Sequence, residues 1–209
     1  MYDVSELIIM TAAVSFFGFW LENIFIAFRH GHMDNRGMHL PFLLGYGLAV
    51  LAFYIVLGTP DAPRFPAVTH TGGVSGYFLI SAAAVSVGEL ILGFTVEKKF
   101  GFSYWDYSSI PMHITKYTSV PTSMGFGAVI TLFMHHCFEL LMTLISKFPA
   151  ALLKPAAGIL MCMLIWDFVT SFLYMHKNHC LKTIWTIALK APGAGRKNAL
   201  AADRRSARR

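Results

Sequence analysis

The sequence predicts an all-α, polytopic integral membrane protein with about five transmembrane helices, and three observations support this. Of its 209 residues, 56% are hydrophobic and only 13% are charged, about half of the roughly 25% found in soluble domains. The mean hydropathy is +0.56. Apolar stretches near the spanning length of about 20 residues recur along the chain. Together these features exclude an ordinary soluble domain, a disordered chain and a disulfide-stapled fold.

The apolar stretches define a transmembrane domain over residues 1–175. Its helices are expected at residues 5–28, 42–58, 76–96, 120–146 and 155–175. The second stretch is short, close to the lower length limit for a spanning helix. The N-terminus carries Asp3 and Glu6, where a cleavable signal peptide would carry bases, so no cleavable signal is predicted.

Basic residues are concentrated at the C-terminus. Residues 176–209 hold nine Lys/Arg and one acid, whereas residues 1–175 hold eight bases and ten acids. We therefore expect the tail to contact anionic lipid headgroups of the bilayer, and we expect no nucleic-acid partner. With five spans, fourteen Lys/Arg residues lie on the side of the membrane that holds the C-terminus and three lie on the other side. This predicts a protein of a bacterial cell membrane with its N-terminus outside and its C-terminus in the cytoplasm.

The C-terminal region begins with an apolar stripe over residues 177–190. Four residues recur at helical spacing: Leu181, Ile184, Trp185 and Ala188. This pattern predicts an amphipathic helix that lies in the cytoplasmic interface, followed by a disordered basic tail at residues 196–209. A sixth span is the alternative, but the stretch is short and carries Lys182 in its middle.

A short internal repeat links the second and fourth spans. Pro41-Phe-Leu-Leu-Gly-Tyr-Gly47 matches Pro121-Thr-Ser-Met-Gly-Phe-Gly127. Each copy follows a span with one acid about seven residues before its cytoplasmic end, Glu22 in the first and Glu89 in the second. Two hairpins that enter the membrane in the same direction would form a parallel repeat. Prolines and small residues are also common in unrelated spans, so the pattern allows both interpretations.

Acidic residues within the spans are the main candidates for function. Glu22, Glu89, Glu139 and Asp167 lie in apolar stretches that contain no Lys or Arg. Each charge costs about 2.5–3.5 kcal/mol at a helix centre, so the acids need neutralisation or partners. We expect Arg36, in the loop after the first span, to turn inward, pair with Glu22 or Glu89, and cap an acidic pocket near the cytoplasmic side.

The loop after the third span contributes further pocket candidates: Trp105, Asp106, Tyr107 and Ser108. Asp106 and Ser108 are two residues apart, which predicts a turn with the carboxylate accepting backbone N–H bonds. The aromatic residues would then anchor this turn at the membrane interface. A catalytic Asp106 is the alternative.

A secondary polar cluster is predicted from His135, His136, Glu139 and Asp167. His135 and Glu139 are four residues apart in one span and therefore face the same way on an α-helix. A proton relay or metal site could use such a set, but a hydrogen-bonded polar core accounts for it more simply. We predict no metal and no cofactor.

The chain resembles the ABC-transporter type IV family of membrane proteins over about residues 14–130. The matching positions are Glu22, Asn35-Arg36-Gly37, Pro41, Gly45-Tyr46-Gly47, Glu89, Glu97-Lys98, Trp105-Asp106-Tyr107-Ser108 and Pro111. The resemblance implies a permease-like role. The sequence contains no Gly-x4-Gly-Lys-Ser/Thr phosphate loop, so active transport would need a separate ATPase subunit, and a homo-oligomer is a further expectation.

Three functions fit these features. The first is a transport component in which the acids line a polar path between two hairpins. The second is a small intramembrane enzyme that acts on a lipid or isoprenoid, with Glu22, Glu89 or Asp106 as acid–base groups. The third is a membrane assembly factor. The resemblance favours the first, and whether the protein is an enzyme stays open.

Overall fold

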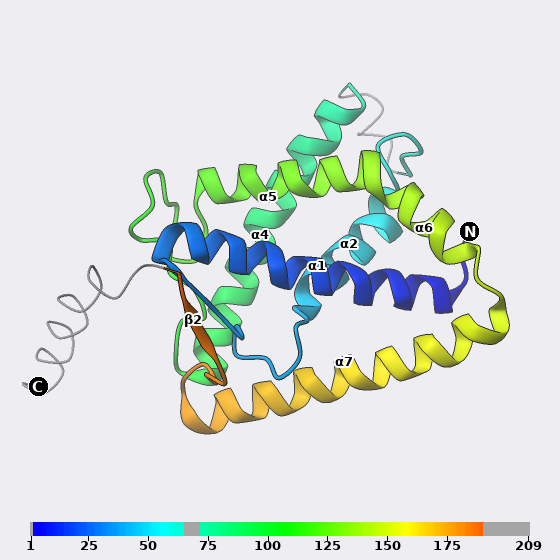
Figure 1. Ribbon diagram of the computed structural model, residues 1–209. Coiled ribbons are helices and arrows are strands. Elements are labelled where there is room, and N and C mark those ends of the chain that lie inside the picture. The colour runs from blue at the N-terminus through cyan, green and yellow to red at the C-terminus, as the bar shows by residue number, and fades with distance from the viewer. Residues whose placement is uncertain (1, 65–71, 190–209) are drawn as a thin grey trace, which may run out of the picture.

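The computed structural model describes residues 2–64 and 72–189, and within them it is predominantly helical (Figure 1). The elements, in chain order, are α1 (Val4–His30), β1 (His32–Asp34), α2 (Leu44–Leu57), α4 (Val74–Phe100), α5 (Val120–Leu132), the π-helical turn η1 (Phe133–Cys137), α6 (Phe138–Ser146), α7 (Ala150–Asn178) and β2 (Thr186–Ala188). The predicted all-α membrane class is confirmed.

Four of the helical runs are long and apolar enough to cross a membrane: Val4–His30, Val74–Phe100, Val120–Ser146 and Ala150–Asn178. The remaining apolar helix, α2, has 14 residues. At 1.5 Å per residue it is about 21 Å long, shorter than the roughly 30 Å hydrocarbon core of a bilayer. The five predicted apolar helices are therefore present, and α2 is the shorter one.

Close packing joins the helices into two hairpins. α1 packs against α2 and α7, and α4 packs against α5. A side chain at Gly47 of α2 would collide with the Thr11 carbonyl and the Ser15 hydroxyl of α1. A Cβ atom at Gly127 of α5 would lie 2.8 Å from the Ala82 Cα atom of α4. In each hairpin a glycine of the repeated motif allows close helix contact.

A buried core connects the two hairpins and α6. Its fully buried members include Met10, Tyr77, Met134, Phe138 and Met142, all 0% exposed. A second cluster lies near the loops, where Phe19, Met38, Leu43 and Met175 are buried together. Most other large apolar side chains point outward, as expected of helices whose outer surface faces lipid.

The predicted amphipathic helix over residues 177–190 is wrong. α7 ends at Asn178, and His179 follows in a left-handed conformation with φ +53°. The chain then runs extended through residues 181–189, here called the C-terminal strap. Its strand β2 pairs antiparallel with β1, with Met33 opposite Ile187.

The strap uses its apolar residues in a different way from a helix. Leu181 and Trp185 pack on the cluster around Phe19 and Met175. The Asn35 side chain binds the strap backbone at the Lys182 carbonyl and the Ile184 N–H. Tertiary contacts therefore override the helical spacing of the apolar residues. The basic tail predicted at residues 196–209 lies outside the described residues.

Candidate functional site

Glu22 lies on α1 with two polar partners. The Tyr46 hydroxyl donates to Glu22 Oε2 at 2.6 Å, and Arg36 Nη2 lies 3.2 Å from Oε1. The Tyr46 ring packs against α1 at Gly18, where a Cβ atom would leave it no room. The predicted inward pairing of Arg36 with Glu22 is present, and it supplies the positive charge that the intramembrane carboxylate requires.

Arg36 is held in a strained and nearly buried position. Its backbone φ is +50°, which is uncommon for a residue other than glycine, and its side chain is 10% exposed. Asp34 accepts the Arg36 backbone N–H at 2.8 Å and lies 3.7 Å from Nη1. The Tyr104 hydroxyl donates to the Arg36 carbonyl at 2.6 Å. Such strain persists only where the surroundings impose it, so this loop determines where the guanidinium lies.

Two buried side chains anchor this loop, residues 31–43, from different sides. Asn35 donates to the Lys182 carbonyl at 2.7 Å and accepts the Ile184 N–H at 2.9 Å, which ties the loop to the strap. Asp167 on α7 accepts the backbone N–H groups of His39 at 2.7 Å and Leu40 at 3.2 Å. Asp167 therefore positions the loop that carries Arg36.

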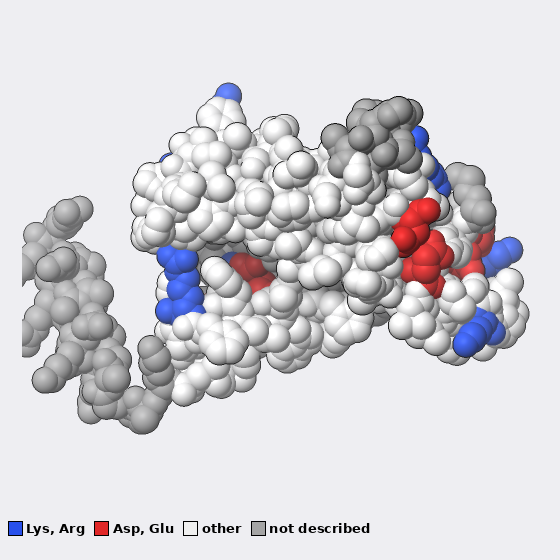
Figure 2. All heavy atoms as spheres, turned by 90° about the horizontal axis from the view of Figure 1, so that it is seen from above, with Lys and Arg blue, Asp and Glu red and all other residues white. Residues whose placement is uncertain are grey.

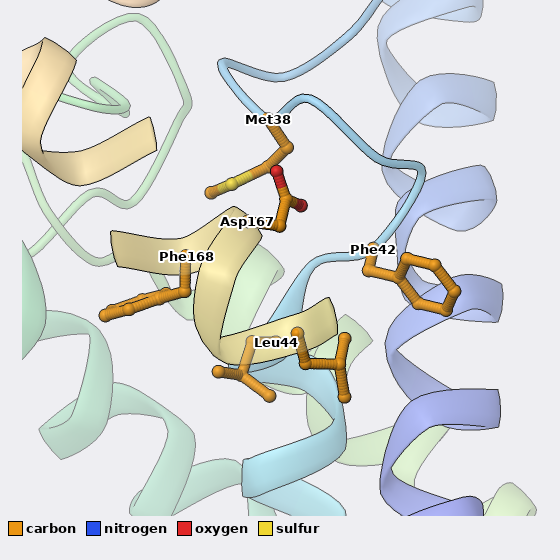
Figure 3. Close-up of a pocket in the computed structure, with 6 residues that line it drawn as sticks. Met38, Phe42, Leu44, Asp167 and Phe168 are labelled. Carbon is orange, nitrogen blue, oxygen red and sulfur yellow. The ribbon is translucent and has the colours of Figure 1, made fainter. Parts of the chain in front are cut away.

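Asp167 also borders a narrow recess between this loop, the start of α2 and α7 (Figure 3). The other lining residues are Met38, Phe42, Leu44, Leu164 and Phe168. In Figure 3 the Asp167 carboxylate points toward the loop beside Met38. The recess leaves no room for a water molecule, which agrees with an anchoring role for Asp167.

Glu89 lies on α4 among hydroxyl groups. The Tyr107 hydroxyl donates to Oε1 at 3.2 Å, and the Thr118 and Ser123 hydroxyls donate to Oε2 at 2.9 Å and 3.4 Å. Thr118 and Ser123 are buried, with their hydroxyl oxygens 3.1 Å apart. Among residues 2–64 and 72–189, no Lys, Arg or His forms an ion pair with Glu89. The start of α5 contributes only the partial positive charge of a helix N-terminus.

Within the segment from Trp105 to Ser108, only Tyr107 reaches an intramembrane acid. The Trp105 indole N–H donates to the Tyr117 carbonyl at 2.8 Å. Asp106 accepts the Ser108 N–H at 2.8 Å, which is the predicted turn. Hydrogen bonds from the side chain and the backbone of Ser108 lower the pKa of Asp106. Trp105, Asp106 and Ser108 therefore shape the loop over residues 101–119, and Tyr107 connects it to Glu89.

The two hairpins meet beside these groups, where the Tyr46 ring lies 6.1 Å from the Phe126 ring of α5. Burial and the nearby Glu89 and Glu22 carboxylates raise the pKa of Tyr107, and burial raises the pKa of Tyr104 to about 12. Both phenols are therefore neutral hydrogen-bond donors at physiological pH. We refer to the resulting set as the polar network: Glu22, Arg36, Tyr46, Glu89, Tyr107, Thr118 and Ser123.

One lateral face of the helical bundle is hollowed. Figure 2 shows an acidic group at the base of this hollow and a basic group beside it at the surface. The Glu22 side chain is 22% exposed, so the polar network is not sealed from its surroundings. A second group of acids lies at the end of the molecule near the N-terminus (Figures 1 and 2).

The predicted secondary cluster is not brought together by the described hydrogen bonds. His135 Nδ1 lies 2.9 Å from Asp61 Oδ2, whereas Glu139 accepts the Tyr2 hydroxyl at 2.6 Å. The rings of His135 and His136 are 4.3 Å apart. The π-helical turn η1 changes the register between His135 and Glu139, because an i+5 turn replaces the i+4 spacing of an α-helix. Asp167 instead binds the loop near Arg36, as described above.

No group of three or more His, Cys, Asp or Glu that could hold a metal ion occurs in the described part of the chain. Three members of the polar network were not predicted as site residues: Tyr46, Thr118 and Ser123. The internal repeat carried the signal for two of them, because Tyr46 lies in its first copy and Ser123 in its second.

The fold and the network define a polytopic α-helical membrane protein with a polar site between two hairpins. The family model described as "Putative ABC-transporter type IV" matches residues 9–172. The chain belongs to this family and is a transport-related integral membrane protein. The match extends the predicted resemblance at residues 14–130 in both directions. No curated protein and no solved structure matches the chain.

Proposed function

We propose that the protein is a permease-like component of a membrane transport system. In this proposal the polar network contacts the substrate near the cytoplasmic side. The supporting observation is that two intramembrane carboxylates from different hairpins lie where those hairpins meet. Tyr46, which binds Glu22, has its ring 6.1 Å from that of Phe126 on α5, and Tyr107 binds Glu89 at 3.2 Å. Polar and ionisable groups within a membrane are costly and usually face the bundle interior or a water-filled path. The network is therefore the best candidate for a solute-binding position.

The partners follow from the same proposal. Energy for active transport would come from a separate ATPase subunit, or a second copy of this chain would complete the pathway. The basic C-terminal residues, on the predicted cytoplasmic side, would contact anionic headgroups. The segment from Trp105 to Ser108 would support the network through Tyr107 and contribute to the rim of the pocket.

A deletion and complementation experiment in the source cell tests this function with the native partners in place. Uptake of small ions and polar solutes is measured in the wild-type and deletion strains, and the deletion strain is complemented with Glu22→Gln, Glu89→Gln or Glu139→Gln. We expect deletion to lower uptake of at least one solute. Wild type and Glu139→Gln should restore it, whereas Glu22→Gln and Glu89→Gln should not, at equal amounts of protein in the membrane.

Glu139→Gln is a matched control because it makes the same carboxylate-to-amide change in a helix of the same bundle. Its carboxylate binds Tyr2, outside the polar network. Unchanged solute uptake in the deletion strain, or full restoration by the Glu22→Gln and Glu89→Gln variants, would contradict the proposal.

An intramembrane enzyme that acts on a lipid or isoprenoid is the second candidate, and the hollow in Figure 2 favours it. An acidic group at the base of a lateral hollow is placed where an amphiphile could enter from the bilayer. The same strains discriminate the two functions. Accumulation of one lipid class with normal solute uptake would support the enzyme, and its reversal should then depend on Glu22 or Glu89.

A further inference from the structure

We propose that Glu89, Tyr107, Thr118 and Ser123 form a binding site for one small monovalent cation, with Na⁺ as the representative ligand. The site deepens the proposed transport function, on which its role as a coupling or co-transported ion rests. The binding itself can be measured separately from transport. Three features of the polar network carry this proposal: its charge balance, its oxygen chemistry and the acceptor capacity of its hydroxyl groups.

Among the described residues, one carboxylate of the polar network has no cationic partner. Glu22 has the Arg36 guanidinium at 3.2 Å, whereas the described residues supply no cationic side chain to Glu89. Asp34 adds a third carboxylate on the other side of Arg36, at 3.7 Å. The surroundings of Arg36 are therefore already acidic, which disfavours an anionic ligand and favours a cation.

The atoms around Glu89 are those that hard cations prefer. Thr118 Oγ1 lies 2.9 Å from Glu89 Oε2 and 3.1 Å from Ser123 Oγ, and Ser123 Oγ lies 3.4 Å from Glu89 Oε2. Tyr107 Oη lies 3.2 Å from the other carboxylate oxygen of Glu89. Oxygen donors of this kind bind hard cations, whereas transition metals favour imidazole or thiolate ligands. A single carboxylate balances a single positive charge, so a monovalent ion fits better than a divalent one.

The hydroxyl groups also retain unused acceptor capacity. Each hydroxyl has one proton to donate and two lone pairs. When Tyr107, Thr118 and Ser123 donate their protons toward Glu89, lone pairs of the buried Thr118 and Ser123 remain. A cation that lies against these oxygens, on the side away from their protons, would be coordinated by those lone pairs.

Thermal unfolding of the purified full-length protein in detergent tests binding directly. The midpoint Tm is followed by tryptophan fluorescence in NaCl and in choline chloride at equal ionic strength and constant pH. A ligand that binds only the folded state raises Tm. At about 100 times the dissociation constant, Na⁺ should raise the wild-type Tm by roughly 5–10 °C relative to choline.

Three variants locate the ion. Glu89→Gln should abolish the Na⁺-dependent shift, and Ser123→Ala, which removes one oxygen and keeps the carboxylate, should weaken Na⁺ binding about tenfold. Glu139→Gln should retain the full shift. Ser123→Ala keeps the test decisive if Glu89→Gln does not fold, because it changes affinity without removing the charge.

The proposal is overturned if Na⁺ and choline give the same wild-type Tm, or if both the Glu89→Gln and Ser123→Ala variants keep the wild-type Na⁺ response. It is also overturned if acidification alone raises Tm through Glu89, since the occupant would then be a proton. Failure of the proposed transport function has a different signature: solute uptake would not respond to Glu22→Gln or Glu89→Gln, whatever the effect of Na⁺ on Tm.

Discussion

The two hairpins pack their helices in the same way but provide different partners for their intramembrane acids. In α1–α2, Gly47 packs on Thr11 and Ser15, and in α4–α5, Gly127 packs on Ala82. Ser15 lies seven residues before Glu22, and Ala82 lies seven residues before Glu89. The helix contact is thus repeated at the same distance along the chain from each acid, and only the partners of the two carboxylates differ.

The difference between the hairpins originates in their loops. The loop after α1 is held by Asn35 and Asp167 and brings a guanidinium to Glu22. The loop after α4 brings the Tyr107 and Thr118 hydroxyls to Glu89 and uses its cation, Lys116, elsewhere: Lys116 Nζ lies 2.6 Å from Glu97. A shared helical frame therefore supports one acid paired with a guanidinium and one acid held by hydroxyl groups.

Removal of Arg36 should have the largest effect on stability, because it leaves Glu22 without a cation and with only the Tyr46 hydroxyl described as its partner. Loss of one member of a largely buried ion pair leaves an uncompensated charge. We expect Arg36→Ala to lower the free energy of unfolding by about 3 kcal/mol, measured by SDS titration in mixed micelles. Arg29→Ala, which removes an exposed arginine bonded to Ser109, should change it by less than about 0.5 kcal/mol.

A double variant separates charge from packing at this pair. Glu22→Gln together with Arg36→Ala should cost less than the sum of the two single changes, because the uncompensated carboxylate is gone. Additive effects would show that Glu22 and Arg36 do not interact in the membrane protein.

Alanine at the two contact glycines should have the next largest effect and tests whether the hairpins pack alike. Gly47→Ala and Gly127→Ala should each lower the free energy of unfolding by about 1–3 kcal/mol through overpacking. Gly45 and Gly125 occupy the earlier glycine of each motif and have open space around them. Their alanine variants should be neutral or stabilising by up to about 1 kcal/mol. Equal effects at all four positions would contradict the shared contact.

Loss of a phenol hydroxyl should show that the two acids depend on tyrosine to different degrees. Tyr46→Phe removes the 2.6 Å hydrogen bond to Glu22 and should cost about 2 kcal/mol. Tyr107→Phe removes the 3.2 Å hydrogen bond to Glu89 and should cost about 1 kcal/mol, because Thr118 and Ser123 remain. The same SDS titration measures both variants, and a larger loss for Tyr107→Phe would reverse the comparison.

The sequence was sufficient for the helices and for one contact in the site. Long apolar stretches predict spanning helices directly, since the bilayer sets their length. Arg36 could be paired with Glu22 or Glu89 because an intramembrane acid needs a cation, and the structure selects Glu22. The same reasoning overlooked Thr118 and Ser123, because hydroxyl residues carry no charge and are common in loops.

Two errors share a physical origin in tertiary structure. Leu181 and Trp185 have helical spacing, yet hydrogen bonds between Asn35 and their backbone segment, and their packing near Phe19, hold them in the C-terminal strap. His135 and Glu139 have α-helical spacing, yet the π-helical turn separates them. Periodicity shows which residues would share one face of an ideal helix. It does not show how contacts with a neighbouring loop, or an inserted π-helical turn, change the local backbone conformation.

The smallest predicted effect concerns the turn at Asp106, which distinguishes the loop after α4 from the shorter loop after α1. Hydrogen bonds from Ser108 lower the pKa of Asp106 in the folded protein. A carboxyl group with a lowered folded-state pKa stabilises the fold above its unfolded pKa of about 3.9, and this contribution disappears as pH falls through the folded-state value. Asp106→Asn should therefore cost about 0.5 kcal/mol at neutral pH, an exposed-site value reduced by solvent screening. Tm measured from pH 7 downward should show the wild-type and Asp106→Asn curves converging in acid.

Because Asp106 shapes the loop without touching Glu89, the Asp106→Asn variant should keep the Na⁺-dependent Tm shift. Loss of that shift would place Asp106 in the ion site.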